Sequence, residues 1–283
     1  MASMQELTVI VPVRDGENWI ADCLSSIARS SPAQIIVVDG LSTDRTVELA
    51  TAHGARVISD AGRGVAAARH IGAQAARTRY VALIDVDVVL RDRALEQLLD
   101  EFIAGGYTGL QAGLHSVAGP GYWGQALAQH HRTGRSKHWF GLVATILERE
   151  ALLEHGLDER FLSGEDIDLR WRLDQAGAKT GVSRTTIVDH RFGDGWQFAM
   201  GQWLADGHGL GRMLGVHGLR SLRLLALPLA AALRGCALTL TRRQPQWIPY
   251  YLCFCAFNYV GMAREVCRRG GRRRDLVAAE MPG

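Results

Sequence analysis

The sequence predicts an α/β protein built on a Rossmann-like, mostly parallel sheet flanked by helices. Short apolar runs rich in β-branched residues alternate with segments of helical periodicity over the first hundred residues, as in parallel sheets covered on both faces. Acidic residues close two of those runs. With 283 residues, 47% hydrophobic and 22% charged, the chain can bury a sizeable core, which excludes disordered and fibrous proteins.

The predicted strands and helices follow one another in a regular order. The strands are the apolar runs Leu7–Val13, Ile35–Val38, Ala55–Ile58 and Tyr80–Ile84. The helices between them are predicted at Trp19–Ile27, Asp44–His53 and Val65–Ala76. From Tyr107 to Val188 the pattern is mixed, with helices predicted at Tyr122–His131, Glu148–His155 and Glu165–Gln175. A sheet of this kind binds ligands at the carboxyl ends of its strands.

The chain after Gly193 is predicted to be helical and basic. We therefore expect a first domain at 1–196, with halves at about 1–104 and 105–196, and a helical extension at 197–283. No carboxylate occurs between Gly207 and Arg264, whereas seven arginines do: Arg212, Arg220, Arg223, Arg234, Arg242, Arg243 and Arg264. The net charge of +3 is too small to indicate a nucleic acid partner by itself.

Two segments of the extension, Leu222–Thr241 and Gln246–Ala263, are apolar enough to suggest a membrane. A spanning hairpin places Arg242 and Arg243 on the far side, against the usual cytoplasmic bias of basic residues. Attachment to the membrane surface avoids this conflict and is the favoured interpretation. Helices packed against the first domain, or against a second subunit in a homo-oligomer, are the remaining alternative.

The cysteines and the N-terminus bear on the cellular compartment. The five cysteines are scattered and lack the paired spacing of a zinc site, which favours a reducing compartment. Met1–Glu6 lead directly into an apolar run without the pattern of a signal peptide. We expect a cytoplasmic protein, peripheral on the cytoplasmic face of the membrane.

Two loops at strand ends are candidate ligand sites. Asp39 ends an apolar run in a turn that leads into a helix, where its carboxylate can accept hydrogen bonds from a nucleoside; Asp44 more simply caps the helix. Gly62-Arg-Gly64-Val opens the helix that contains Arg69. Such a helix start favours phosphate, although a tight turn with a solvated arginine has the same pattern.

Three further groups of residues are candidates for chemistry. Asp85 and Asp87 end a buried strand two residues apart, where a divalent cation offsets their repulsion and desolvation. Glu165, Asp166 and Asp168 begin a helix, which suits either the helix dipole or a general base. His190 follows a short apolar run, and a lone histidine there is more often structural than a ligand.

In this order, the motifs resemble the inverting family 2 glycosyltransferases of the GT-A fold. The resemblance covers about Leu7–Trp196 and rests on five segments: Val9–Glu17, Val37–Thr46, Gly64–Gly72, the D-x-D pair Asp85/Asp87 and Glu165-Asp166. It implies that the half at 1–104 binds a nucleoside-diphosphate sugar and the half at 105–196 the acceptor. The extension at 197–283 is outside the resemblance.

The resemblance also implies roles for individual residues. The nucleotide-sugar ligands are Pro12, Val13, Glu17, Asp39, Gly64, Arg69, Asp85 and Val86. Asp85 and Asp87 hold Mg²⁺ or Mn²⁺, and His190 is a further metal ligand. The Glu165-Asp166 pair supplies the catalytic base, with Asp166 the more plausible member.

Two departures from the family pattern refine this expectation. His70 replaces the usual Asn after Ala-Arg. No Q-x-x-R-W motif of processive synthases follows Asp166, so we expect transfer of a single sugar. The acceptor that we expect is a lipid-linked or cell-envelope glycan. A sugar-nucleotide-forming nucleotidyltransferase stays open as an alternative, although the segment Val11–Arg14 lacks its Gly-rich loop. A non-catalytic nucleotide-sugar-binding protein stays open as well.

Overall fold

The computed structural model describes residues 3–134 and 139–279. The chain forms two compact units, which we describe separately. The sheet unit comprises Met1–Ala118, His131–Arg160 and Glu165–Phe192, and the helical unit comprises Gly119–His130, Phe161–Gly164 and Gly193–Gly283. Each unit is built from several separate stretches of the sequence. The domain boundary expected near residue 196 stays a prediction. The last four residues of the expected extension lie outside the described residues.

Within the described residues, eight strands form one sheet in the order β3-β2-β1-β4-β7-β6-β8-β5. They are β1 (Leu7–Val13), β2 (Gln34–Asp39), β3 (Arg56–Ser59), β4 (Tyr80–Ile84), β5 (Val88–Val89), β6 (Gly109–Val117), β7 (Ala144–Glu148) and β8 (Thr180–Arg191). β1 to β4 pair in parallel, as do β6 and β8. β7 is antiparallel to β4 and β6, and β5 is antiparallel to β8. The predicted α/β class with a mostly parallel sheet is confirmed.

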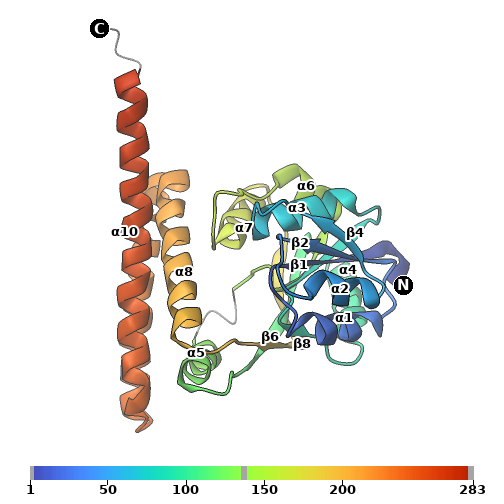
Figure 1. Cartoon of the computed structure of the whole chain (residues 1–283), viewed down its shortest axis with the longest axis horizontal. Coiled ribbons are helices and arrows are strands. Elements are labelled where there is room, and N and C mark those ends of the chain that lie inside the picture. Colours follow the sequence, from blue (N-terminus) through green and yellow to red (C-terminus); the bar gives the residue numbers. More distant parts are fainter. Residues whose placement is uncertain (1–2, 135–138, 280–283) are drawn as a thin grey trace. The chain divides into compact units, whose positions relative to one another are not determined.

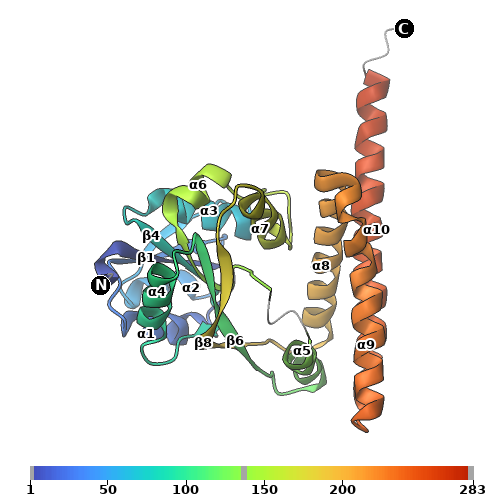
Figure 2. The same cartoon turned by 180° about the vertical axis from the view of Figure 1, so that it is seen from behind.

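Helices cover both faces of this sheet (Figures 1 and 2). One face carries α1 (Ile20–Ala28), α2 (Thr46–Ala52) and α4 (Ala94–Ala104); the other carries α3 (Val65–Ala75), α6 (Arg149–His155) and α7 (Glu165–Gln175). In β1, Val9 and Val11 pack on the first face and Ile10 on the second, all fully buried. A strand covered on both sides needs apolar residues at every position, which explains the continuous apolar run.

The helical unit contains α8 (Trp196–His217), η3 (Gly218–Ala226), α9 (Leu227–Thr241), η4 (Pro245–Trp247) and α10 (Ile248–Ala279), with most of α5 (Tyr122–Thr133). A Cβ on Gly207 of α8 would lie only 2.0 Å from the carbonyl oxygen of Asn258, so the backbones of α8 and α10 are in contact. Aromatic rings add to this unit: Trp203 of α8 is buried and contacts Trp123 of α5, Trp196, Tyr250 and Phe257.

A buried carboxylate fixes α10 against α8. Glu265 has a fully buried side chain and pairs with His208 at 3.1 Å, Arg212 at 3.3 Å and Arg268 at 2.8 Å. A carboxylate removed from water is tolerated only with such partners. The pairs therefore fix the axial position of α10 relative to α8.

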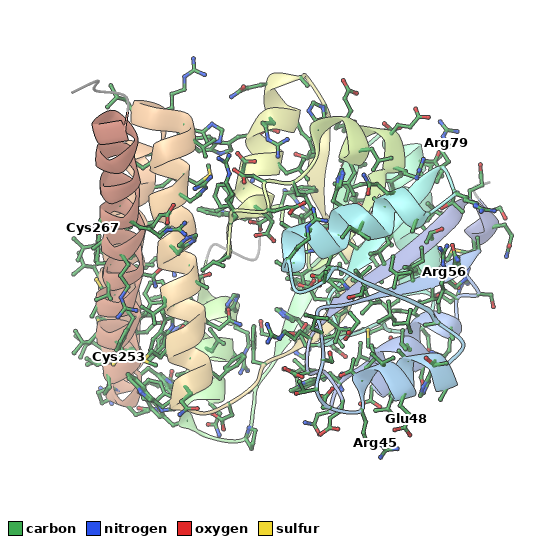
Figure 3. All side chains as sticks on the ribbon, turned by 45° about the horizontal axis from the view of Figure 1, so that its top comes forward. Arg45, Glu48, Arg56, Arg79, Cys253 and Cys267 are labelled. Atoms are coloured by element: carbon green, nitrogen blue, oxygen red, sulfur yellow. The ribbon has the colours of Figure 1, made fainter. Side chains whose placement is uncertain are left out.

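One stretch of the described chain, Trp196–Thr241, is long and apolar enough by composition to cross a membrane, with a mean hydropathy of 1.7 over its best window. Only 28% of that window is buried. It contains the predicted segment Leu222–Thr241, whereas Gln246–Ala263 lies mostly within α10. The cysteines are free thiols, and three of them, Cys253, Cys255 and Cys267, lie in α10; Figure 3 labels Cys253 and Cys267.

Candidate active site

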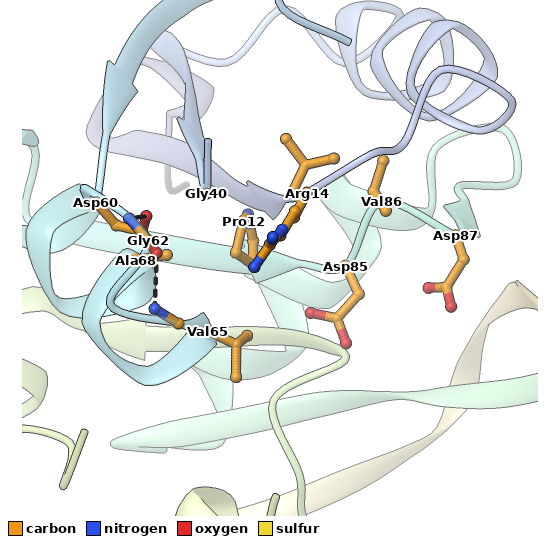
Figure 4. A pocket seen from close by; sticks show the side chains of 12 residues that line it. Pro12, Arg14, Gly40, Asp60, Gly62, Val65, Ala68, Asp85, Val86 and Asp87 are labelled. Carbon is orange, nitrogen blue, oxygen red and sulfur yellow. Dashed lines mark hydrogen bonds between the residues drawn. The ribbon is translucent and has the colours of Figure 1, made fainter. Parts of the chain in front are cut away.

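A cavity of about 320 Å³ opens at the carboxyl ends of β1, β2 and β4, beside the N-terminus of α3 (Figure 4). Six of its lining residues were predicted as site residues: Pro12, Val13, Gly64, Asp85, Val86 and Asp87. The other lining residues are Arg14, Gly40, Asp60, Gly62, Val65 and Ala68. These residues meet at one edge of the sheet because parallel strands bring their carboxyl ends together.

The loop before α3 presents a helix N-terminus to this cavity. Gly64 has φ +99°, which favours glycine, and α3 begins with the next residue. The buried Asp60 carboxylate accepts the Gly62 N–H at 2.7 Å and the Gly64 N–H at 3.0 Å. In the described structure no side chain caps α3, so its first N–H groups are available to an anion. Sequence reasoning missed Asp60, although an acid shortly before two glycines is a recognisable signal.

The loops after β1 and β2 are joined by reciprocal hydrogen bonds. The Asp44 carboxylate accepts the Glu17 N–H at 2.9 Å, and the Glu17 carboxylate accepts the Arg45 N–H at 3.2 Å. Asp39 is buried and accepts the Ser42 N–H at 3.2 Å. Glu17 and Asp39 do not line the cavity. Glu17 joins the two loops, and Asp39 holds the turn that follows β2. Direct contact of either residue with a nucleotide stays a prediction.

Arg69 connects the cavity to the start of α7. Its guanidinium is buried, donates to Asp85 Oδ1 at 2.7 Å and also donates to Glu165 Oε1. Two carboxylates from distant parts of the chain thus share one cation. The sequence pattern predicted a nucleotide-sugar ligand at Arg69, whereas in the structure its two terminal nitrogens contact carboxylates.

Asp87 and His190 meet because β5 pairs with β8, in a register that places Val88 opposite His190. His190 Nε2 lies 3.3 Å from Asp87 Oδ2. Burial acts to lower the pKa of His190, but the hydrogen bond and negative charge of Asp87 outweigh it and hold this pKa above its usual value. The structure therefore brings these two predicted metal ligands together, and the third, Asp85, lines the same cavity as Asp87.

These residues fit a divalent cation. Asp87 Oδ1 is buried and has no hydrogen-bond partner among the described residues, and carboxylate oxygen suits Mg²⁺ and Mn²⁺. Burial raises the pKa of Asp85, and the positive charge of the Arg69 guanidinium offsets only part of this rise. Within residues 3–134 and 139–279, no three His, Cys, Asp or Glu side chains are grouped closely enough to hold a metal alone. Phosphate oxygens of a nucleotide supply the missing ligands in such sites.

The three acids that begin α7 differ in their contacts. Glu165 is buried against Arg69, and Asp168 is buried and pairs with Arg172 at 2.7 Å. Asp166 is only half-buried, and its Oδ1 accepts the Ile167 N–H at 2.8 Å. Asp166 is thus the most accessible carboxylate of the three, as a general base must be.

Comparison with known proteins agrees with this geometry. Residues 8–150 match the family model "Glycosyl transferase family 2". The chain belongs to this family. A pre-mycofactocin glycosyltransferase of Mycobacterium tuberculosis is 31% identical to this family 2 member over 206 residues, which are 66% of the chain but only 43% of the relative's length. An uncharacterized glycosyltransferase of Mycobacterium bovis is 33% identical over 180 residues, 60% of this chain and 80% of that one.

The fold of this family 2 glycosyltransferase also occurs in a solved structure. The mannosyltransferase PcManGT from Pyrobaculum calidifontis, in complex with GDP-Man and Mn²⁺, has a TM-score of 0.65 and covers 91% of this chain and 87% of its own. At 16% identity, this likeness shows the fold alone, and it confirms the expected GT-A type of sheet with a helical C-terminal region.

Proposed function

We propose that this protein transfers one sugar from a nucleoside-diphosphate sugar to an acceptor hydroxyl, with inversion at the anomeric carbon. The observation that carries the proposal is the cavity at the strand ends, where the uncapped N-terminus of α3 and the pair Asp85 and Asp87 line one space. A helix N-terminus attracts phosphate, and paired carboxylates beside it suit a phosphate-bound cation.

The proposed mechanism is a single in-line displacement. The hydroxyl oxygen of the acceptor forms a bond to the anomeric carbon while Asp166 accepts the proton of that hydroxyl. The bond from that carbon to the phosphate oxygen breaks, and the nucleoside diphosphate leaves with the electron pair. Glu165 is buried against Arg69, whereas Asp166 is the more exposed member of the pair, so we take Asp166 as the base. One displacement inverts the anomeric configuration.

The residues around Asp87 support a metal-dependent reaction. Asp87 and His190, with Asp85 beside them, would hold Mg²⁺ or Mn²⁺, which when bound supplies positive charge against the departing phosphates. The N-terminus of α3 adds the partial positive charge of its N–H groups to the same region. Both kinds of charge stabilise the leaving group more than the intact donor.

A donor screen tests the proposal. Purified protein is incubated with a panel of nucleoside-diphosphate sugars that includes GDP-mannose and UDP-glucose, with Mn²⁺, with Mg²⁺ or with EDTA, and release of nucleoside diphosphate is measured. We expect one donor to release nucleoside diphosphate. EDTA should abolish this release, and the Asp87→Ala variant should not show it. Release of pyrophosphate from a nucleoside triphosphate and a sugar phosphate would instead show a nucleotidyltransferase, and binding without turnover would show a binding protein.

We further propose that the helical unit attaches to an anionic membrane surface and that the acceptor is lipid-linked. The outer face of α9 exposes Leu229, Leu233 and Leu240, at 48%, 63% and 61%. Three arginines are exposed in the same part of the chain: Arg220 and Arg223 of η3 and Arg234 of α9. Leucines with interspersed arginines suit the interface of a bilayer that contains anionic lipids.

Flotation with liposomes tests this attachment. We expect the protein to float with vesicles of phosphatidylcholine and phosphatidylglycerol, and less with phosphatidylcholine alone. Leu233→Ser with Leu240→Ser should weaken flotation. The matched control is Ile103→Ser, which changes an exposed apolar residue of α4. If the double variant floats as well as the control, α9 does not contact the membrane.

A further inference from the structure

The backbone of Gly141, in the segment that leads into β7, is held by two buried side chains. Gln111 of β6 accepts the Gly141 N–H on its Oε1 at 2.7 Å, and the Thr145 hydroxyl of β7 donates to the Gly141 carbonyl at 2.7 Å. Gln111 and Thr145 are each only 1% exposed and lie opposite one another in the β6–β7 register. The Gly141 backbone, which lies outside the hydrogen-bonded strands of the sheet, is thus held by two buried polar side chains.

The space beside Gly141 is occupied by the carboxylate of Asp166. A Cβ on Gly141 would lie 2.9 Å from Asp166 Oδ2 and 2.9 Å from Gln111 Oε1, closer than real Cβ atoms approach other atoms. Gly141 is not among the residues with positive φ, so its backbone conformation does not require glycine. The missing side chain therefore matters because Asp166 fills its place.

We propose that Gln111, Gly141 and Thr145 form a base seat that fixes the carboxylate of Asp166 for catalysis. The inference rests on the proposed function, because it takes Asp166 as the base. The three residues are positioning residues. Gln111 and Thr145 hold the Gly141 backbone, and Gly141 leaves open the space that the Asp166 carboxylate occupies.

The Gly141 backbone and the backbone at the start of α7 are both held in place. The Gly141 peptide is bonded on both sides, and the start of α7 is held by the pair between Glu165 and Arg69. A methyl group at position 141 therefore requires the Asp166 carboxylate or the Gln111 amide to shift. Gln111 is fully enclosed and Asp166 only half-buried, so we infer that the Asp166 carboxylate is the group that moves. A misplacement of about 1 Å in a reacting group costs on the order of 10²-fold in rate.

The first test is structural and does not depend on activity. Crystal structures of the wild type and Gly141→Ala are compared at the start of α7. We expect the Asp166 carboxylate to move while the bond between Arg69 and Glu165 is retained. An Asp166 carboxylate in the same place in both structures would overturn the base seat, whatever reaction the protein catalyses.

The second test is kinetic, with the donor that the screen identifies. Gly141→Ala should lower kcat by about 10- to 100-fold with the donor KM changed less than about twofold, since donor contacts are untouched. Thr145→Val, which removes the hydroxyl, should also lower kcat, and Thr145→Ser, which keeps it, should retain wild-type turnover. The matched control is Gly201→Ala in α8, where an added Cβ meets nothing within 4 Å.

A double variant separates a positioning role from a general loss of packing. In the Asp166→Asn background, Gly141→Ala should lower the remaining rate little, because both changes act on one carboxylate. Equal fold-losses in both backgrounds, or a Gly141→Ala variant as active as Gly201→Ala, would overturn the inference. A wild type without turnover on any donor would count against the proposed function, while the crystallographic comparison would still decide the base seat.

Discussion

Removing the Arg69 guanidinium should destabilise the sheet unit more than removing one of its partners. The Arg69 side chain is 5% exposed and pairs with Asp85, at 26%, and with Glu165, at 7%. In Arg69→Met the Glu165 carboxylate stays buried without its cation, which typically costs about 3–5 kcal/mol. In Glu165→Gln the guanidinium keeps its bond to Asp85, so we expect a loss of only about 1–3 kcal/mol.

The double variant Arg69→Met with Glu165→Gln isolates the interaction. It removes a buried cation and a buried anion together, so its loss in the free energy of unfolding should be smaller than the sum of the single losses by about 1–3 kcal/mol. The matched control is Arg63→Met, which breaks the pair between Arg63 and Glu159. Those side chains are 52% and 35% exposed, and an exposed pair contributes only about 0–1 kcal/mol.

Hydrogen–deuterium exchange measures these differences in the sheet unit itself. The slowest amides of β1 and β4 lie in the centre of the sheet and exchange only when this unit opens, so their exchange rates give its opening free energy. The reasoning is refuted if the losses of the two single variants add up to the loss of the double variant within about 0.5 kcal/mol. It is also refuted if Arg69→Met loses no more stability than Arg63→Met. Arg69 would then contribute no more than a surface arginine does.

Three further predictions concern catalysis, metal binding and pH. Asp166→Asn should retain donor binding in equilibrium dialysis while transfer falls by about 10²–10⁴; a larger loss in Glu165→Gln would make Glu165 the base. His190→Ala should raise the Mn²⁺ concentration needed for half-maximal activity, and an unchanged titration would leave His190 with a structural role. Burial lowers the pKa of His130 from 6.5 to about 4, so the folded state resists the proton that the unfolded chain accepts. The free energy of unfolding should therefore fall by about 2 kcal/mol from pH 7 to pH 5 in urea titrations; an equal fall in His130→Gln would contradict this.

The parallel half of the sheet was predictable because its signal is local. β1, β4 and α7 begin and end where the sequence predicts, and the other helices and strands predicted by range differ by at most two residues at either end. Period and composition reflect burial on both faces of the sheet. The strand-end rule then placed Asp85 and Asp87 in a cavity.

The contacts between distant segments were beyond local signals. Asp87 meets His190 only through the register of β5 with β8, and Arg69 meets Glu165 across 96 positions. Gln111 carries no pattern that distinguishes it from a surface glutamine, since its function depends on a peptide 30 residues away. Such contacts depend on tertiary packing, and they leave no regular spacing in a single sequence from which they could be predicted.

The discontinuity of the helical unit has a consequence for recombinant expression. α5 is inserted in the sequence between β6 and β7, yet its Trp123 packs on Trp196 and Trp203, and Tyr122 stacks on Trp247. A stop codon after residue 192 deletes these partners and leaves α5 behind with bare aromatic rings, a surface prone to aggregation. Truncation is therefore a poor route to a protein that stays dispersed without detergent. Replacing the exposed leucines of α9 by polar residues keeps the partners of α5 and is the better strategy for purification and crystallisation.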